Sequence, residues 1–314
     1  MRALASPASL KGVLSAREAA SLLADGFGRA GIVAEQSPIA DGGEGTAEVL
    51  DAHVVRSVPV HDAFGRAREA PIWALGDGTV IVESAGAIPL DPSRLDVLAA
   101  SSRGFGELIA AVGECPRLLV CLGGTATMDG GAGLLEVLDE LPAPTLALCD
   151  TRATLGEAPR AFGPQKGALA DDVPRLEERL LSLEHGRSLA KLPGGGAAGG
   201  LGAALASLGA ELVSGAEYVL EVNGFRERAA RQDLVVTGEG TVDRTTFEGK
   251  APGEALRICR ELGVRCVLFG GRVEEGMGRE ATAMSGDPAR ARADLEELGL
   301  RLGTEAGPAN VDES

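Results

Sequence analysis

A buried strand that turns through glycines toward a helix is the most constraining feature of this 314-residue chain. Residues Leu118–Leu122 are all apolar, which is typical of a strand buried on both faces of a sheet. Gly123 and Gly124 end the run, and helical spacing of apolar residues begins at Ala132. Such a turn points backbone N–H groups and the positive end of a helix dipole at one place, which suits an anion. The pattern predicts an α/β fold with either a phosphate-binding turn or an ordinary strand–helix turn.

The last third of the chain repeats this pattern with charged residues. Residues 233–237 and 265–269 read as buried strands, and residues 253–262 as the helix between them. Glu239, Asp243 and Lys250 follow the first of these strands. Ligands bind at the carboxyl ends of strands in open α/β sheets, so these residues are candidates for a site.

The middle of the chain carries short strands without intervening helices. Residues 54–60, 70–75 and 80–83 alternate or are apolar, and a hairpin signal at residues 76–79 joins the last two. These strands predict an antiparallel patch that is distinct from the strand–helix region.

Composition excludes several classes of partner. The net charge of −16 argues against a nucleic-acid or anionic-membrane partner, because binding phosphate backbones or headgroups requires a basic face. The five cysteines form no C-x-x-C pair, as expected for free thiols in a reducing compartment. We find no signal peptide and no apolar run of membrane-spanning length, so we expect a cytoplasmic protein.

Two turns near the N-terminus carry charged candidates. Lys11 lies just before a predicted helix whose start is marked by a capping box, Ser15 and Glu18. It could meet a substrate anion, or it could simply be solvated. Asp41 and Glu44 occupy a second glycine turn, where they could hold magnesium, accept a proton, or merely cap a helix.

Familiar catalytic motifs are absent from the sequence. It contains no G-x-x-x-x-G-K-[ST], G-x-S-x-G or H-E-x-x-H, and its three histidines are scattered. Residues 194–199 formally match G-x-G-x-x-G, but no clear strand precedes them. We therefore expect a mobile or ligand-hugging loop before a helix over residues 201–208. Acidic turns, glycine turns and loop lysines, including Lys166, remain, and these are the parts of a magnesium-assisted phosphoryl-transfer site.

Five blocks, in order along nearly the whole chain, resemble the bacterial glycerate kinase family. They are Asp41-Gly-Gly-Glu-Gly-Thr46, Gly123-Gly-Thr-Ala-Thr-Met-Asp-Gly-Gly-Ala-Gly133, Phe162-Gly-Pro-Gln-Lys-Gly-Ala168, residues 194–204, and Thr237-Gly-Glu-Gly-Thr-Val-Asp243 with Gly249-Lys-Ala-Pro252. The resemblance implies an ATP-dependent kinase that phosphorylates D-glycerate, in this family typically to 2-phosphoglycerate, with Mg²⁺ as cofactor. It leaves open whether the enzyme is a monomer or a homodimer.

The resemblance also implies two α/β domains with the active site in the cleft between them. One is a discontinuous Rossmann/flavodoxin-like domain with a parallel sheet, and the other is an inserted mixed α/β domain. The expected boundaries give the first domain residues 1–52, 96–140 and 215–305, the second residues 53–95 and 141–214, and a disordered tail residues 306–314.

Four departures from the family pattern keep alternatives open. Ala8 stands where the family has aspartate, Met128 where it has asparagine, and Arg152 lies in a changed Asp-x-x-Asn-Pro-Leu segment. The connection over residues 138–145 is also short. A kinase for another small hydroxy acid, or an impaired homologue that only binds nucleotide or metabolite, are the alternatives.

The mechanism that we expect assigns candidate residues to four roles. ATP phosphates are expected at Gly123, Gly124, Thr125, Thr127, Gly130 and Gly131. Magnesium is expected at Asp41 or Asp129. Asp41 or Glu239 would accept the hydroxyl proton, while Lys11, Lys166 or Lys250 would neutralise negative charge. Ser9, Glu44 and Asp243 would contact the glycerate.

Overall fold

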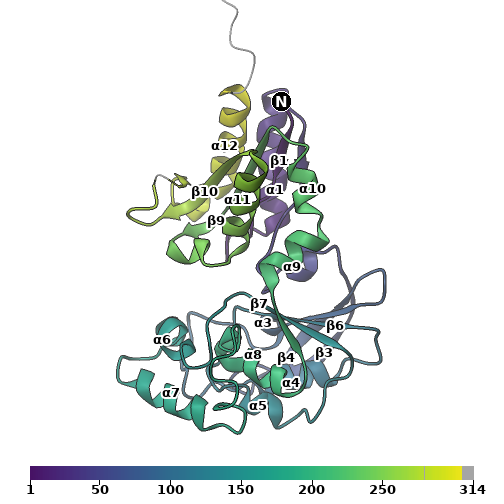
Figure 1. The fold of residues 1–314 in the computed structure, drawn as a ribbon, viewed down its shortest axis with the longest axis vertical. Helices are drawn as coiled ribbons and strands as arrows, with labels where there is room; N and C mark the ends of the chain where they lie inside the picture. Colours follow the sequence, from purple (N-terminus) through teal and green to yellow (C-terminus); the bar gives the residue numbers. More distant parts are fainter. Residues whose placement is uncertain (279, 306–314) are drawn as a thin grey trace, which may run out of the picture. The chain divides into compact units, whose positions relative to one another are not determined.

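A computed structural model describes residues 1–278 and 280–305 and divides the chain into two compact units. Unit 1 combines residues 1–40 with residues from 219 onward, and unit 2 comprises residues 41–218. Each unit has its own sheet with helices around it (Figure 1). The predicted class, a discontinuous α/β domain with a second α/β domain inserted, is therefore confirmed. The tail predicted over residues 306–314 lies outside the described residues.

Unit 1 is built on a five-stranded parallel sheet. Its strands, in spatial order, are β11 (Thr282–Ala283), β10 (Arg265–Val273), β9 (Leu234–Val242), β1 (Ala3–Ala5) and β2 (Ala34–Gln36). Numbered by their order within unit 1 and read from β2, the strands run 2-1-3-4-5, which is the flavodoxin-like order. The direction of winding reverses between β1 and β9, so the topological switch point of this sheet lies there.

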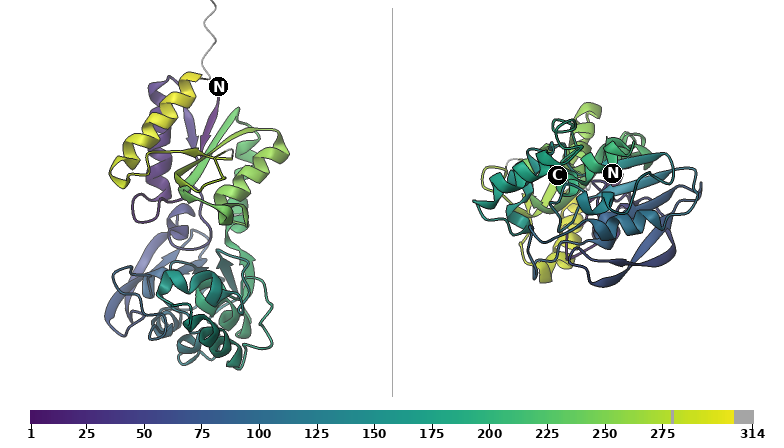
Figure 2. Two further views of the ribbon diagram at one scale, coloured as in Figure 1. Left: turned by 90° about the vertical axis from the view of Figure 1, so that its left-hand side faces the viewer. Right: turned by 90° about the horizontal axis from the view of Figure 1, so that it is seen from below.

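Helices cover both faces of this sheet. Helix α1 (Ala16–Arg29) packs along α12 (Ala291–Glu305) on one face, and α11 (Ala251–Leu262) lies on the other (Figure 2, left). Glycines bring α1 and α12 close together, since a Cβ atom at Gly26 would stand 2.2 Å from the Glu296 carbonyl oxygen. The predicted capping box of Ser15 and Glu18 begins α1. The shorter helical elements of this unit are α10 (Phe225–Ala229), η2 (Arg244–Phe247) and η3 (Pro288–Arg290), while α9 (Gly215–Val222) spans the boundary.

Unit 2 is built on a six-stranded mixed sheet in the order β3-β4-β5-β6-β7-β8. The strands are β3 (His53–His61), β4 (Ala67–Ala74), β5 (Val80–Glu83), β6 (Leu118–Leu122), β7 (Thr145–Cys149) and β8 (Glu211–Ser214). The pairs β3–β4 and β4–β5 are antiparallel, and β5 to β8 run parallel. Every residue of β6 is buried, as its apolar sequence predicts.

The sheet of unit 2 corrects two expectations. The antiparallel strands are not a separate patch, because β5 pairs with β6 along four residues. Residues 41–52, 96–140 and 215–218, expected with the chain ends, therefore belong to unit 2. The physical reason is that β6 finds its hydrogen-bond partners in β5 and β7, which sequence periodicity alone does not specify.

Helices and turns complete unit 2. They are α2 (Thr46–Val49), α3 (Ser84–Ala87), α4 (Arg103–Ala110), α5 (Ala132–Leu135), α6 (Ala158–Phe162), η1 (Pro164–Lys166), α7 (Asp172–Ser182) and α8 (Ala197–Ser207). The core joins alternate β6 side chains to Phe105 and Leu108 of α4. A smaller cluster holds α6 and α7 through Ala158, Leu176 and Leu180. Among the described residues, every helix is too short or too polar to span a bilayer.

Candidate functional site

The loop after β1 lies along the carboxyl end of β9, at the switch point of unit 1. The Ala8 N–H donates to the Gly238 carbonyl oxygen at 2.8 Å. A Cβ atom at Gly240 would stand 3.7 Å from the backbone nitrogen of Lys11. Ser9 is half-buried and Lys11 is exposed in this loop. Both predicted residues therefore lie at the sheet edge where ligands of such folds bind.

Glu239, Asp243 and Lys250 are brought together at the same edge. The Lys250 Nζ lies 3.4 Å from Glu239 Oε2 and 3.7 Å from Asp243 Oδ1. All three side chains are mostly buried, with 14 to 26% of their surface exposed. These three candidates therefore lie in contact with one another.

Thr246 is a member of this cluster that the sequence analysis missed. It is fully buried, and its hydroxyl donates to Glu239 Oε1 at 2.7 Å. The Asp243 N–H donates to the same hydroxyl oxygen at 3.1 Å. The spacing Asp243-x-x-Thr246 is a capping-box pattern, which was the available signal.

The Asp243 carboxylate is stabilised in its charged form. Partial burial raises its pKa, but hydrogen bonds from Thr245 and the positive charge of Lys250 outweigh burial and lower the pKa below its usual value. Asp243 also accepts the N–H groups of Thr245 and Thr246, so it fixes the start of η2. Its contacts with the protein are therefore extensive before any substrate binds.

In unit 2, the glycine turn after β6 contains both occupied and unoccupied N–H groups. The Gly123 N–H donates to Ser84 Oγ, and the Ala126 N–H donates to the Ile88 carbonyl oxygen. No acceptor among the described residues pairs with the N–H groups of Gly124, Thr125 and Thr127. Because buried donors without acceptors are costly, these N–H groups suit a phosphate ligand.

The helix after this turn differs from the prediction. Helix α5 is a single turn, Ala132–Leu135, and the N–H of Gly133 donates to Asp129. A single turn has little macrodipole, and its donors already have acceptors. The N–H groups of Gly124, Thr125 and Thr127, and not a helix N-terminus, are therefore the candidate donors for an anion.

Lys166, which the sequence predicted in a loop, lies at the end of η1 and is buried beneath this turn. Its Nζ donates to the Thr127 carbonyl oxygen at 2.8 Å and to Thr125 Oγ1 at 3.3 Å. Burial lowers the pKa of Lys166 to about 8, although the negative charges of Asp150 and Asp129 act to raise it. The ammonium group is thus anchored directly to the residues that present the free N–H groups.

Two carboxylates flank the glycines of the turn. A Cβ atom at Gly123 would stand 2.8 Å from Asp150 Oδ2, and one at Gly124 would stand 3.5 Å from Glu44 Oε2. Asp150 follows β7 directly, a position that could have marked it as a candidate. Asp41 is half-buried and begins the turn that also carries Glu44.

The segment 41–46 is held by a third carboxylate, Glu83 at the end of β5. Its oxygens accept the N–H groups of Gly45 at 3.2 Å and Ala47 at 2.8 Å. Burial raises the pKa of Glu83, although these two hydrogen bonds oppose the rise. The sequence analysis did not identify Glu83.

Asp129 has a structural role that argues against the predicted metal ligation. Its Oδ2 accepts the N–H and hydroxyl of Ser102 and the N–H of Gly133, while its Oδ1 accepts the N–H of Gly131. The side chain is 2% exposed. It therefore links α4 to α5 and offers little to a metal ion.

Gly130 and Gly131 do not fit the phosphate-binding role that the sequence suggested. The Gly130 N–H donates to the Gly199 carbonyl oxygen at 3.0 Å, and the Gly131 N–H is bound by Asp129. Residues 194–200, expected as a mobile or ligand-hugging loop, are buried and pack against the turn. Their glycines allow close backbone contact, since a Cβ atom at Gly199 would stand 1.9 Å from the Thr127 carbonyl oxygen.

A magnesium–phosphate group fits the residues of this turn. No group of three or more His, Cys, Asp or Glu side chains in the described part of the chain could hold a metal alone. Magnesium, however, is commonly bound by one or two carboxylates together with substrate phosphates and water. Glu44 and Asp150, which flank Gly124 and Gly123, supply carboxylates beside the free N–H groups.

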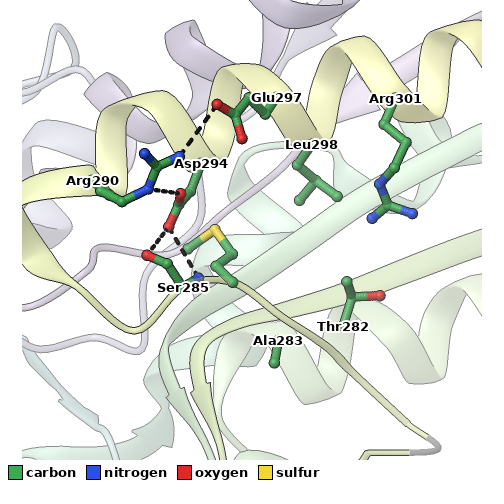
Figure 3. A pocket seen from close by; sticks show the side chains of 9 residues that line it. Thr282, Ala283, Ser285, Arg290, Asp294, Glu297, Leu298 and Arg301 are labelled. Atoms are coloured by element: carbon green, nitrogen blue, oxygen red, sulfur yellow. Dashed lines mark hydrogen bonds and ion pairs between the residues drawn. The ribbon is translucent and has the colours of Figure 1, made fainter.

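A separate hollow of about 380 Å³ lies between β11 and α12 in unit 1 (Figure 3). Arg290 is paired there with Asp294 and Glu297, and Ser285 donates to Asp294. None of the predicted site residues lines it, and Arg290 and Asp294 neutralise each other. We do not regard this hollow as the candidate active site.

Comparison with known proteins gives concordant findings. The model of the glycerate kinase family matches residues 3–140 and 143–287. A protein of Mycobacterium bovis named only as uncharacterised is 35% identical, covering 87% of this chain and 79% of its own. The glycerate 2-kinase of Escherichia coli K12 is 32% identical, covering 88% and 87%. A crystal structure of a glycerate kinase 2 from Salmonella typhimurium LT2 superposes with a TM-score of 0.73 at 27% identity, covering 97% of this chain and 98% of that one.

Proposed function

Because the chain belongs to the glycerate kinase family, we propose that it transfers the γ-phosphate of ATP to D-glycerate, with magnesium, to give 2-phosphoglycerate. Membership in the family implies a kinase acting on a small molecule. The name of the Escherichia coli relative, glycerate 2-kinase, supports the choice of acceptor and of the phosphorylated position.

The observation that carries the proposal is the glycine turn with its buried lysine. The N–H groups of Gly124, Thr125 and Thr127 lie in one turn, and none of them has an acceptor in the part of the chain that the structure describes. Lys166 adds a positive charge anchored to the same turn. This combination of fixed donors and a desolvated cation suits the phosphates of a nucleotide.

Two residues receive catalytic roles in this proposal. Asp41 accepts the proton of the glycerate hydroxyl, while the hydroxyl oxygen attacks the γ-phosphorus and ADP leaves. Glu239 is hydrogen-bonded by Thr246 and paired with Lys250, so it is better suited to holding Lys250 than to accepting a proton. Lys250 balances the charge that develops on the transferring phosphoryl group.

The remaining candidates bind the substrates. Lys11 and Ser9, at the switch point of unit 1, receive the glycerate carboxylate and hydroxyl groups, and Asp243 also contacts the glycerate. Asp41, or Glu44 together with Asp150, would hold magnesium, which would neutralise part of the negative charge on the nucleotide phosphates. Correct positioning and charge neutralisation then contribute most of the rate.

The test is ADP release by the purified protein with Mg-ATP, with and without D-glycerate. We expect stimulation by D-glycerate and not by L-glycerate, with ³¹P NMR identifying 2-phosphoglycerate. Asp41→Asn should abolish most of the stimulation, whereas Lys191→Met, at an exposed lysine, should retain it. Stimulation by a different hydroxy acid would replace the acceptor. ATP binding without turnover for any acceptor would identify a binding protein and refute the kinase.

A further inference from the structure

We propose that Thr246 is a positioning residue that holds Glu239 at a distance from Lys250 and so keeps Lys250 available for phosphate. The inference rests on the proposed function, in which Lys250 acts on the transferring phosphoryl group. Thr246 itself is fully buried on η2. It therefore acts through Glu239 and not on a substrate.

The direction of the Thr246 hydroxyl follows from its two partners. The Asp243 N–H can only donate, so it must meet a lone pair of the hydroxyl oxygen. The single hydroxyl proton is then directed to Glu239 Oε1, 2.7 Å away. One oxygen of Glu239 is thus fixed by a short hydrogen bond to a buried group.

This hydrogen bond holds one end of the carboxylate whose other end faces Lys250. The other oxygen, Oε2, lies 3.4 Å from Lys250 Nζ, and Asp243 Oδ1 lies 3.7 Å from it. Both distances exceed the 2.7–2.9 Å of a tight charge-assisted hydrogen bond. Lys250 is therefore held between two carboxylates but bound tightly by neither.

Loss of the hydroxyl should change this balance. Without its bond to Thr246, the Glu239 carboxylate loses the contact that fixes Oε1, and Oε2 can move closer to Lys250. The ammonium group would then have to leave this pair before it could stabilise the phosphoryl group. This change raises the free energy of the transition state, where charge develops, more than it weakens substrate binding.

The variants that test this are Thr246→Val and Thr246→Ser. Thr246→Val removes the hydroxyl at nearly constant volume, and we expect kcat to fall roughly tenfold while both KM values change less than about threefold. Thr246→Ser keeps the hydroxyl and should restore kcat to near the wild-type value. Thr237→Val is the matched control, because Thr237 is also fully buried and on β9, and its hydroxyl has no partner among the described residues. It should leave kcat unchanged.

A double-mutant cycle distinguishes positioning from a general loss of structure. In a Glu239→Gln background, Thr246→Val should have no more than a small further effect on kcat, because the two residues act through one interaction. Equal effects of Thr246→Val in both backgrounds, or failure of serine to restore kcat, would overturn the proposal. Thermal unfolding of each variant shows whether the protein is folded.

A readout independent of turnover separates this inference from the proposed function. Crystal structures of the two variants measure the distance from Lys250 Nζ to Glu239 Oε2 directly. We expect this distance to shorten from 3.4 Å to the 2.7–2.9 Å of a tight charge-assisted hydrogen bond in Thr246→Val, and to stay near 3.4 Å in Thr246→Ser. An unchanged distance in Thr246→Val would refute the role of Thr246 even in an active kinase. If the distance shortens but D-glycerate does not stimulate ADP release, only the kinase proposal fails.

Discussion

At the scale of single residues, Lys166 shows how an ordinary loop sequence can hold a strongly perturbed group. It is 4% exposed, and burial lowers its pKa to about 8. Its hydrogen bonds to Thr125 and Thr127 satisfy the ammonium group, so the charge is tolerated beneath the glycine turn. A buried cation of this kind is typical of a functional site and costs stability.

Substitution of Lys166 should reveal this cost as a pH dependence of the free energy of unfolding. The folded state binds the Lys166 proton less tightly than the unfolded state, whose pKa is near 10.5. Stability of the wild type relative to Lys166→Met should therefore rise between pH 8 and pH 10.5, by up to about 3 kcal/mol. Urea unfolding at pH 7 and pH 10 measures the difference. The exposed-site control Lys191→Met should show no such trend, and a flat Lys166→Met difference would contradict the assigned burial.

At the scale of elements, the glycine-rich start of α8 packs against the turn that carries the candidate phosphate site. Ala198, Gly199 and Gly200 have positive φ angles inside this helix, and the Gly199 carbonyl accepts the Gly130 N–H. The Thr127 carbonyl oxygen lies where a side chain at Gly199 would begin. Small residues are thus required here for backbone packing.

Gly199→Ala should therefore disturb the turn over residues 123–127. We expect it to be at least about 2 kcal/mol more destabilising than Gly209→Ala, because an added methyl group in a packed site has this cost. Gly209 also has a positive φ, but an added Cβ atom there would meet nothing within 4 Å. Comparison of Gly199→Ala with Gly209→Ala therefore separates the effect of steric overlap from that of backbone strain. Equal destabilisation in denaturant titrations would refute the packing argument.

At the scale of the whole molecule, the two units differ in how their chains are assembled. Unit 2 is one continuous stretch, and the core around β6 lies entirely within it. Unit 1 needs both ends of the chain, because β1 pairs with β9 on one side and β2 on the other. Its own cluster joins α1, α12 and the sheet.

A fragment of residues 41–218 should therefore fold alone, whereas residues 219–314 should not. We expect a cooperative thermal transition and dispersed NMR spectra for the first fragment, since its core and sheet are complete. The second lacks β1 and α1, which cover part of the unit 1 core, and should remain unfolded. Absence of a cooperative transition in fragment 41–218 would show that its folding depends on unit 1.

Sequence patterns were sufficient for local structure and for part of the site. The apolar run of β6 and the Ser15 capping box lie where the patterns placed them, because these signals depend on neighbours in the chain. Glu239 was expected after a strand that ends at residue 237, but it lies within β9, because this strand continues to Val242. The cluster of Glu239, Asp243 and Lys250 could also be predicted, because its members are separated by only a few residues.

Only the tertiary structure decided the rest, since it depends on residues far apart in sequence. The pairing of β6 with β5 and β7 places residues 96–140 in unit 2. Asp129, a predicted metal ligand, instead accepts a hydrogen bond from Ser102. Contacts with Thr125 and Thr127 made Lys166 a buried cation. Sequence periodicity determined which segments are strands and helices, whereas long-range hydrogen bonds and burial determined which charged groups remain available for chemistry.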